Sequence, residues 1–456
     1  MTRAAARANK ARRDGLVLLC LGALTFLVSG ISWAHVALIE QGDFKVVYYS
    51  ARSLLQHGDP YNEQDVLHVY NAEGRERASE PALDREVKTR FFYPPTVFIL
   101  TVPLALLGFA AGKLLWMALC AGAFILAAVL VYDVAADFAP LVAGILCGLL
   151  LAGSFWLLMI GNSAAVAVSL CIIAAWCFFR DRFIWIGVPC LALSLAIKPN
   201  DSGLVWLFFL LSAPSLRRRA FQSLALLILL SLPFLIWVTH IAPSWLTELR
   251  TNMASFSGVG GIVDPGLTGT AGRNMDCIVQ LQTAVSVIFT NPTTWNLVTW
   301  CICVPLLLLW AYRTVATRPA PTGPAFWIGL AAAAPLTMLP TYHFQHDAKL
   351  TLIAIPACAY LWSKAGRTGN VALIITFTAI LINGDIFSAI RILLTRNIVV
   401  PQPSLASHLA TLILTRPSPL FLLALAAFYL WLYSRHRELT AEPLSQQITV
   451  TNESSN

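Results

Sequence analysis

Long runs of apolar residues, separated by short polar or basic linkers, dominate the chain. A helix needs roughly 20 apolar residues to cross the hydrocarbon core of a membrane. The first run extends from Gly15 to Ile39. Twelve further apolar segments follow, at about 96–110, 113–133, 139–160, 163–180, 183–197, 203–215, 219–241, 294–312, 325–341, 348–363, 370–390 and 417–434. The pattern predicts an all-α polytopic membrane protein.

Basic linkers between these segments indicate the topology. Cytoplasmic loops of membrane proteins carry an excess of Lys and Arg. Such residues cluster at 217–219, 313–318, 364–367 and 435–437. If these clusters and both termini are cytoplasmic, the number of spans is even. We therefore expect about 12 transmembrane helices, with a short segment such as 96–110 or part of 183–215 not crossing fully.

We expect one domain with two polar tails. Residues 1–14 form a basic cytoplasmic tail, 15–435 a single transmembrane domain, and 436–456 a disordered cytoplasmic tail. Two long loops, 40–93 and 242–293, fall on the outer side. Loops of this length are usually functional or disordered. The first contains aromatic, acidic and basic residues in helix-like patterns, which favours a function and predicts juxtamembrane helices.

Composition agrees with the membrane prediction. Hydrophobic residues make up 57% of the chain and charged residues 12%, and the mean hydropathy is +0.70. A soluble domain is far less apolar. The formal charge of +8 comes from the basic linkers, so it indicates topology and not nucleic-acid binding. Nine of the ten cysteines lie in apolar segments, and their spacing gives no disulfide framework or metal site.

An amphipathic stretch beginning with Asp43 follows the first apolar run. Apolar residues recur in it at intervals of three and four, as in a helix that lies in the membrane interface. They are Phe44, Val47, Tyr48, Ala51, Leu54 and Leu55. Asp43 falls in the first turn, where free backbone N–H groups favour an ionised carboxylate. It is therefore either a helix cap or a general base.

More polar residues are expected at the outer ends of other segments. They are Asn162, Lys198 and the run from Tyr342 to Lys349, which contains His343 and His346. Lys198 suits either a lipid phosphate or an interfacial position with its ammonium turned to water. The two histidines could bind substrate, relay protons or form part of a metal site, although the spacing identifies no third ligand. A polar interfacial loop is an equal alternative.

Several of these motifs together resemble a known family. They are Gly42-Asp43-Phe44 with Tyr48-Tyr49 and Ala51, Gly58-Asp59-Pro60-Tyr61, Phe92-Tyr93-Pro94-Pro95, Gly161-Asn162 and Ile197-Lys198-Pro199. In order and spacing they are similar to glycosyltransferase family 87, the polyprenol-phosphate-mannose-dependent mannosyltransferase-like enzymes of the GT-C superfamily. Many family members have Gly-Gln where this chain has Gly161-Asn162, so Asn162 provides a shorter amide.

The resemblance implies a membrane hexosyltransferase with an active site on the outer face. Asp43 would be the general base on the acceptor hydroxyl while a polyprenyl phosphate leaves and the anomeric carbon inverts. The residues expected to bind substrate or lipid phosphate are Lys198, Arg52, Asn162, Tyr48, Asp59, His343, His346 and Lys349. We expect no metal and no cofactor. The partners would be a lipid-linked sugar donor, most simply of mannose, a glycolipid or glycan acceptor, and membrane lipids.

The expected location is the plasma or inner membrane, with both termini cytoplasmic and the active site on the periplasmic or outer face. A transporter or flippase of lipid-linked sugars or small solutes is the alternative. It predicts charges inside the spans and paired broken helices in two halves. Here the charges crowd the expected outer edge, and the first outer loop has no counterpart of similar composition, so the sequence favours an enzyme.

Overall fold

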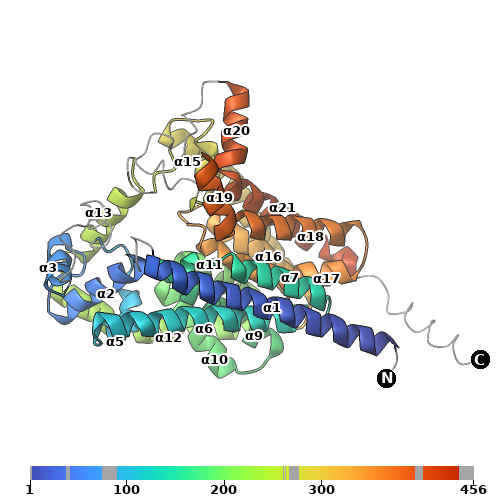
Figure 1. Cartoon of the computed structure of the whole chain (residues 1–456), viewed down its shortest axis with the longest axis horizontal. Helices are drawn as coiled ribbons and strands as arrows, with labels where there is room; N and C mark the ends of the chain where they lie inside the picture. The colour runs from blue at the N-terminus through green and yellow to red at the C-terminus, as the bar shows by residue number, and fades with distance from the viewer. Residues whose placement is uncertain are drawn as a thin grey trace, which may run out of the picture.

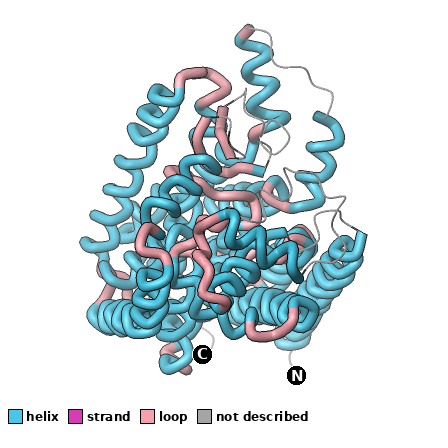
Figure 2. Tube along the Cα trace, turned by 90° about the vertical axis from the view of Figure 1, so that its left-hand side faces the viewer, coloured by secondary structure: helices cyan, strands magenta, loops and turns pink. Residues whose placement is uncertain are grey.

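The computed structural model describes residues 3–36, 42–73, 90–259, 261, 263–266, 277–395 and 404–440. Within them the chain forms helices and loops and no strand (Figure 2). One isolated antiparallel bridge joins Ile278 and Phe344. Parts of the two expected outer loops and the expected tail from 441 onward lie outside the described residues.

Six segments of the described chain are long and apolar enough to cross a membrane. They are α1 (Arg3–Val36), α6 (Phe109–Ala135), α7 with α8 (Pro140–Ala152 and Trp156–Met159), α12 (Pro214–Ile241), α15 (Pro292–Thr317) and α21 (Pro417–Thr440). A bent pair, α18 (Arg367–Ile382) and α19 (Asp385–Thr395), would make a seventh. The all-α membrane architecture is confirmed, whereas twelve spans are not.

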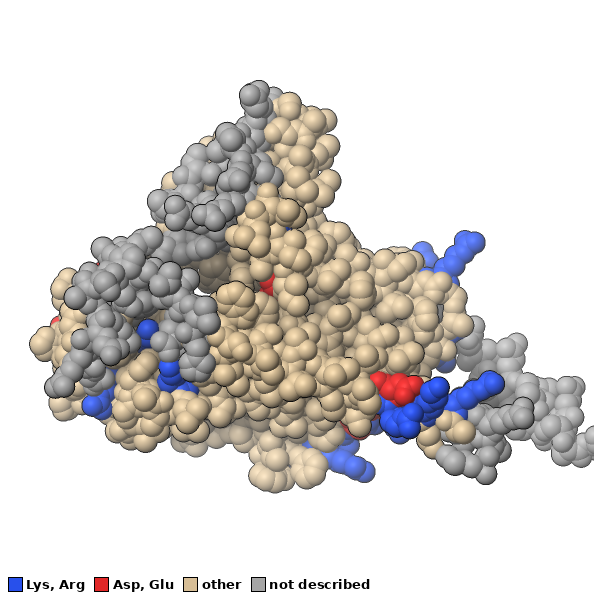
Figure 3. Space-filling view, in the orientation of Figure 1, with Lys and Arg blue, Asp and Glu red and all other residues tan. Residues whose placement is uncertain are grey.

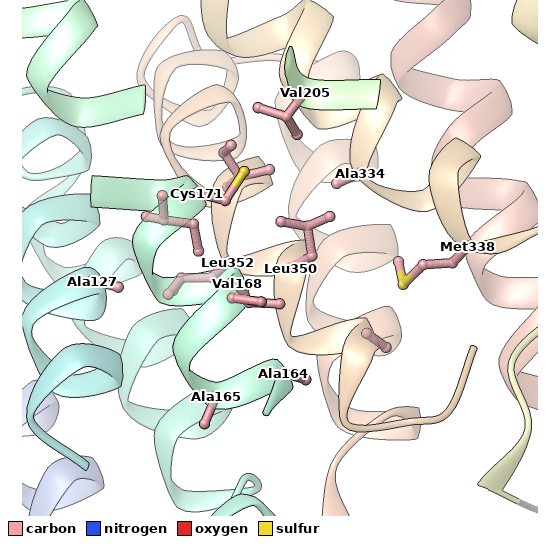
Figure 4. Packing of buried hydrophobic residues seen from close by; sticks show 14 of the residues in the cluster. Ala127, Ala164, Ala165, Val168, Cys171, Val205, Ala334, Met338, Leu350 and Leu352 are labelled. Atoms are coloured by element: carbon pink, nitrogen blue, oxygen red, sulfur yellow. The ribbon is translucent and has the colours of Figure 1, made fainter. Parts of the chain in front are cut away.

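Shorter apolar helices account for most of the difference in number. They are α9 (Ala164–Arg180), α10 (Ile184–Ile197), α11 (Pro199–Leu211), α16 (Pro324–Met338), η4 (Asp347–Ala354) and α17 (Ile355–Ser363). With 17 residues at most, none reaches a spanning length of about 20. Several are buried inside the bundle, where α9, α11, α16 and η4 meet around Val168, Cys171, Val205, Ala334 and Leu350 (Figure 4).

Helices α1 and α7 pack closely because glycines face each other. A Cβ at Gly22 would collide with the backbone of Gly148, and one at Gly144 with the backbone of Gly15. Small residues let membrane helices approach closely and gain van der Waals contact. In Figure 1, α1 runs along the bundle from the N-terminus to the end where α2 lies.

The end of the bundle opposite the N-terminus carries α2 (Gly42–Leu55), α3 (Glu63–Glu73) and α13 (Trp245–Ser257) from the two expected outer loops. It also carries η1 (Pro95–Val97) and α5 (Phe98–Ala105), which follow the first loop, whereas α14 (Leu281–Val285) of the second loop packs against α15 and α21. We expected one apolar face on α2, but nearly every side chain of it is buried. Phe44, for example, stacks on Trp116 and Phe109 with centroids 5.4 and 6.0 Å apart. The expected loop is thus packed against the bundle.

The two expected tails are partly helical. Helix α1 begins at Arg3 and α21 continues to Thr440, so helix extends on both sides of the expected domain 15–435. Lys and Arg gather near the ends of the face seen in Figure 3, and its wide middle has few charged side chains. This arrangement suits a bilayer around the middle of the bundle.

Lys349 and Asp385 form a buried brace between two interrupted helices. Lys349 Nζ donates to Asp385 Oδ1 at 2.9 Å, to Asn383 O at 2.7 Å and to Gly153 O at 2.9 Å. The backbone N–H of Trp156 donates to Asp385 Oδ2 at 2.7 Å. The brace therefore joins the break between α7 and α8 to the bend between α18 and α19.

We expect Lys349→Met to destabilise the protein by about 3–5 kcal/mol, because it leaves the Asp385 carboxylate buried without its cation. Thermal unfolding in detergent measures this as a clear fall in Tm. The double variant Lys349→Met/Asp385→Asn should recover part of the loss. Arg12→Met is the matched control, since it breaks an exposed ion pair with Asp137 that is worth about 0–1 kcal/mol. Equal effects of the two single changes would contradict the brace.

Candidate active site

A cavity of ≈ 450 Å³ opens at the end of the bundle that carries α2 and α13. Ligand sites in proteins are typically of this size, apolar with a few convergent polar groups. Four of the expected site residues line it: Asp43, Asn162, Lys198 and His346. Its apolar and aromatic lining includes Phe92, Tyr93, Ile197, Leu249, Met253, Phe256, Tyr342 and Phe344.

Asp43 is held at the N-terminus of α2. Its backbone N–H donates to Ile160 O at 3.0 Å, and Asn162 Nδ2 donates to its carboxylate Oδ2 at 2.5 Å. Burial raises the pKa of Asp43 above its ordinary value, and the Asn162 hydrogen bond and the charge of Lys198 offset part of that rise. The structure thus holds a carboxylate of increased basicity against the cavity.

Asn162 is oriented by the start of the next helix. Gly161 adopts a positive φ of 67°, which permits the turn between α8 and α9. The side-chain Oδ1 of Asn162 accepts from Ala164 N at 2.7 Å, like an N-terminal helix cap. With the oxygen so engaged, the amide nitrogen points to Asp43. One amide therefore both caps α9 and orients the carboxylate.

Lys198 lies at the break between α10 and α11, next to the cavity. Its Nζ donates to Asp347 Oδ1 at 2.6 Å and to Asn162 Oδ1 at 3.4 Å. Burial alone would lower the pKa of Lys198, but Asp347 and Asp201 raise it overall. Although burial opposes ionisation of Asp347 as well, Lys198 holds the pKa of that carboxyl below its usual range. Both groups are therefore charged at neutral pH.

The two histidines occupy different environments. His346 lines the cavity, and burial lowers its pKa to about 3, so the ring is neutral at physiological pH. His343 is fully buried behind the lining, with Nδ1 3.0 Å from Thr341 O and Nε2 3.2 Å from Asp201 Oδ1. Burial would lower the pKa of His343, but Asp201 raises it overall. His343 thus supports the loop that carries His346.

Four other expected binding residues do not line the cavity. Tyr48 donates its hydroxyl to Leu107 O at 2.8 Å, and Arg52 NH1 donates to Ala105 O at 3.1 Å. Asp59 Oδ1 accepts from Tyr61 N at 2.8 Å, within the Gly-Asp-Pro-Tyr turn. Lys349 belongs to the buried brace with Asp385. These contacts are to other parts of the protein, and the expected binding roles of the four side chains stay predictions.

Two features of the site were not singled out from the sequence. Asp347 was seen only as the neighbour of His346, yet it pairs with Lys198 and accepts from Phe344 N at 2.8 Å. Helix α13 was expected only as loop, yet its Leu249, Met253 and Phe256 form one wall. The position of Asp347 directly after two closely spaced histidines could have identified it from the sequence.

The family-model comparison finds a match to glycosyltransferase family 87 over residues 91–290. No curated protein and no solved structure matches the chain significantly. The matched segment contains Asn162, Lys198 and α13, while Asp43 and His346 lie on either side of it. Together with the all-helical membrane architecture, the match confirms the resemblance. The match over residues 91–290 supports glycosyltransferase family 87 and, with it, a membrane glycosyltransferase.

Proposed function

We propose that the protein transfers a hexose, most simply mannose, from a polyprenyl-phosphate-linked donor to a hydroxyl of a glycolipid or glycan acceptor. The observation that carries the proposal is a single cavity that brings the Asp43 carboxylate and the Lys198 ammonium together between apolar walls. A carboxylate can accept the proton of a hydroxyl, and an ammonium can stabilise a phosphate. Transfer of a sugar from a phosphate carrier can use both.

Asp43 is the general base in this proposal. Because Asn162 engages Oδ2, we assign Oδ1 to the acceptor hydroxyl. As Oδ1 takes the proton, the hydroxyl oxygen forms a bond to the anomeric carbon. The bond from that carbon to the phosphate oxygen breaks on the opposite face, and its electron pair leaves with the polyprenyl phosphate. The anomeric configuration therefore inverts.

Lys198 stabilises the leaving phosphate. Its ammonium has three N–H donors, and Asp347 and Asn162 take two of them. The third is assigned to a phosphate oxygen in the cavity. Because Asp347 and Asn162 fix the ammonium before the donor arrives, little reorganisation is needed as negative charge develops. The proposed reaction uses these side chains without a metal or cofactor.

The lipid-linked donor is inferred from the walls of the cavity. Leu249, Met253 and Phe256 of α13 and Ile197 of α10 surround the polar groups with apolar surface. A sugar carried on a polyprenyl chain suits such a site at the end of a membrane bundle better than a soluble nucleotide sugar does. The family match favours this enzyme over the transporter or flippase alternative.

We place the active site on the outer face of the cell membrane. The basic start of α1, with Lys10, Arg12 and Arg13, lies at the end of the bundle opposite α2 and α13 (Figures 1 and 3). Under the positive-inside rule the basic end is cytoplasmic. The cavity then opens outward, where glycolipid and glycan acceptors reside.

A donor assay tests this proposal. Purified protein in lipid vesicles is incubated with radiolabelled hexoses on polyprenyl monophosphate and, as matched controls, with the same hexoses on nucleoside diphosphates. We expect label to move to an acceptor, or slowly to water, from a polyprenyl-phosphate donor only. Transfer from the nucleotide sugars, or movement of the intact lipid-linked sugar across the bilayer without transfer, would contradict the proposal.

A further inference from the structure

Helices α19 and α20 (Leu405–Thr415) form a pair that stands apart from the bundle. In Figure 1 they run across the direction of α1, α6 and α21, and α19 is turned by 62° from α18. The pair starts at Asp385, close to the cavity end of α7. If α1 and α21 cross the bilayer, α19 and α20 lie closer to its plane.

The amphipathic pattern of α19 is the inverse of that in a water-exposed helix. Its polar residues Asp385, Ser388 and Arg391 face the protein and are buried. Its large apolar residues face outward, with Leu393 70% and Leu394 75% exposed. Water around this helix would require the opposite arrangement. A helix that is surrounded by hydrocarbon exposes its apolar side chains and buries its polar groups against the protein.

Helix α20 continues the same surface. Its exposed apolar residues are Leu405, Leu409, Ile413 and Leu414. No Lys, Arg, Asp or Glu occurs in α20, and those in α19 are buried. In Figure 3 this uncharged surface continues onto the pale middle of the bundle, where the candidate spans lie. An exposed apolar area of this extent is rare on a protein surface in water.

Among the residues that the structure describes, polar contacts anchor the pair to the protein on its inner side. Ser388 Oγ donates to Gln345 Oε1 at 2.5 Å, and Gln345 belongs to the loop that carries His346. At the end of α20 the buried Arg416 donates to Pro265 O at 3.0 Å and to Ser286 Oγ at 2.6 Å. The outward face of the two helices is apolar and suits surroundings that offer no hydrogen bonds.

We infer that the outward face of α19 and α20 is a lipid-contact surface, immersed in the acyl chains of the bilayer at the cavity end of the bundle. The inverted pattern, the absence of outward charge in these two helices and the continuity with the uncharged middle of the bundle all point to hydrocarbon. The pair then supports, from within the membrane, the loop that bears His346.

Nitroxide accessibility in lipid vesicles tests this inference. Single cysteines at Leu394→Cys and Leu409→Cys are labelled in a background where the exposed Cys20 and Cys301 are Ser. Leu229→Cys, on the exposed face of α12, is the hydrocarbon control, and the exposed Asn71→Cys in α3 is the water control. Power saturation compares collision with oxygen, which partitions into hydrocarbon, and with a water-soluble nickel chelate.

We expect the labels at 394 and 409 to collide several-fold more with oxygen than with nickel, as at 229. Greater collision with nickel, as at 71, would place the surface in water and overturn the inference. Protection from both reagents would mean that protein covers it, which also overturns the inference. Ile413→Cys gives a third position should one of the first two variants not fold.

Discussion

Asp43→Asn lowers kcat for sugar transfer by about 10²–10⁴-fold, the usual contribution of a general base. The amide cannot accept the proton of the acceptor hydroxyl, whereas the shape of the side chain is almost unchanged. Binding of the donor should change little, because Lys198 still carries the charge that meets the phosphate. Initial rates with a polyprenyl-phosphate donor, measured over a range of donor concentrations, separate kcat from KM.

The matched control is Asp137→Asn, at an exposed ion pair with Arg12 and Arg180 far from the cavity. This variant should transfer sugar at close to the normal rate, since exposed ion pairs contribute little to stability. Both variants should elute as the native protein does and keep its Tm. Normal turnover by a folded Asp43→Asn protein would show that Asp43 only caps α2.

Lys198→Met lowers the transfer rate by about 10²–10³-fold. This is the usual cost of losing one preorganised group that stabilises developing negative charge. The same change also removes a positive charge that favours the ionised form of Asp43. The pKa of Asp43 should therefore rise, and the acidic limb of the pH–rate profile should move to higher pH. Rates from acidic to neutral pH measure both effects in one protein.

Asp347→Asn should shift the same profile in the opposite direction. Asp347 raises the pKa of Asp43 through its negative charge, so its loss lowers that pKa and moves the acidic limb to lower pH. The other titratable groups around the site include Tyr93, Asp201, Tyr342, His343 and the neutral His346, and all remain in both variants. Opposite shifts support electrostatic control of Asp43, and shifts of the same sign would contradict it.

The sequence predicted those parts of the site that depend on local pattern. Asp43 was located because it begins a stretch with apolar residues at intervals of three and four, just after the first apolar run. Asn162 and Lys198 were located because each interrupts apolar sequence at a helix end. The structure brings these three and His346 to one cavity, and their catalytic and binding roles stay predictions.

Contacts between residues far apart in the chain could not be predicted from the sequence. Lys198 and Asp347 lie 149 positions apart, so their ion pair could not be read from spacing. Arg52 was expected to bind phosphate because a charged side chain next to a membrane is costly unless it has a use. In the structure its guanidinium donates a hydrogen bond to a backbone carbonyl near the end of α5. The type of a residue determines which interactions its side chain can form. The packing of the fold determines with which residue it forms them.

The number of membrane spans could not be predicted from hydropathy alone, because some apolar helices are buried inside the protein. Apolar segments such as 163–180 and 325–341 have the composition of membrane helices, and in the structure α9 and α16 are short and buried on nearly all sides. A helix surrounded by protein is as apolar as one surrounded by lipid. Composition therefore identified the membrane class and could not separate the spans from the buried helices.

The most direct test of the proposed active site is the structure of the protein in lipid with a non-transferable polyprenyl-phosphate hexose analogue bound. We predict that a phosphate oxygen lies within hydrogen-bond distance of Lys198 Nζ and that the anomeric carbon faces the carboxylate of Asp43, with His346 at the sugar. A donor bound outside this cavity, or with its phosphate away from Lys198, would contradict the account.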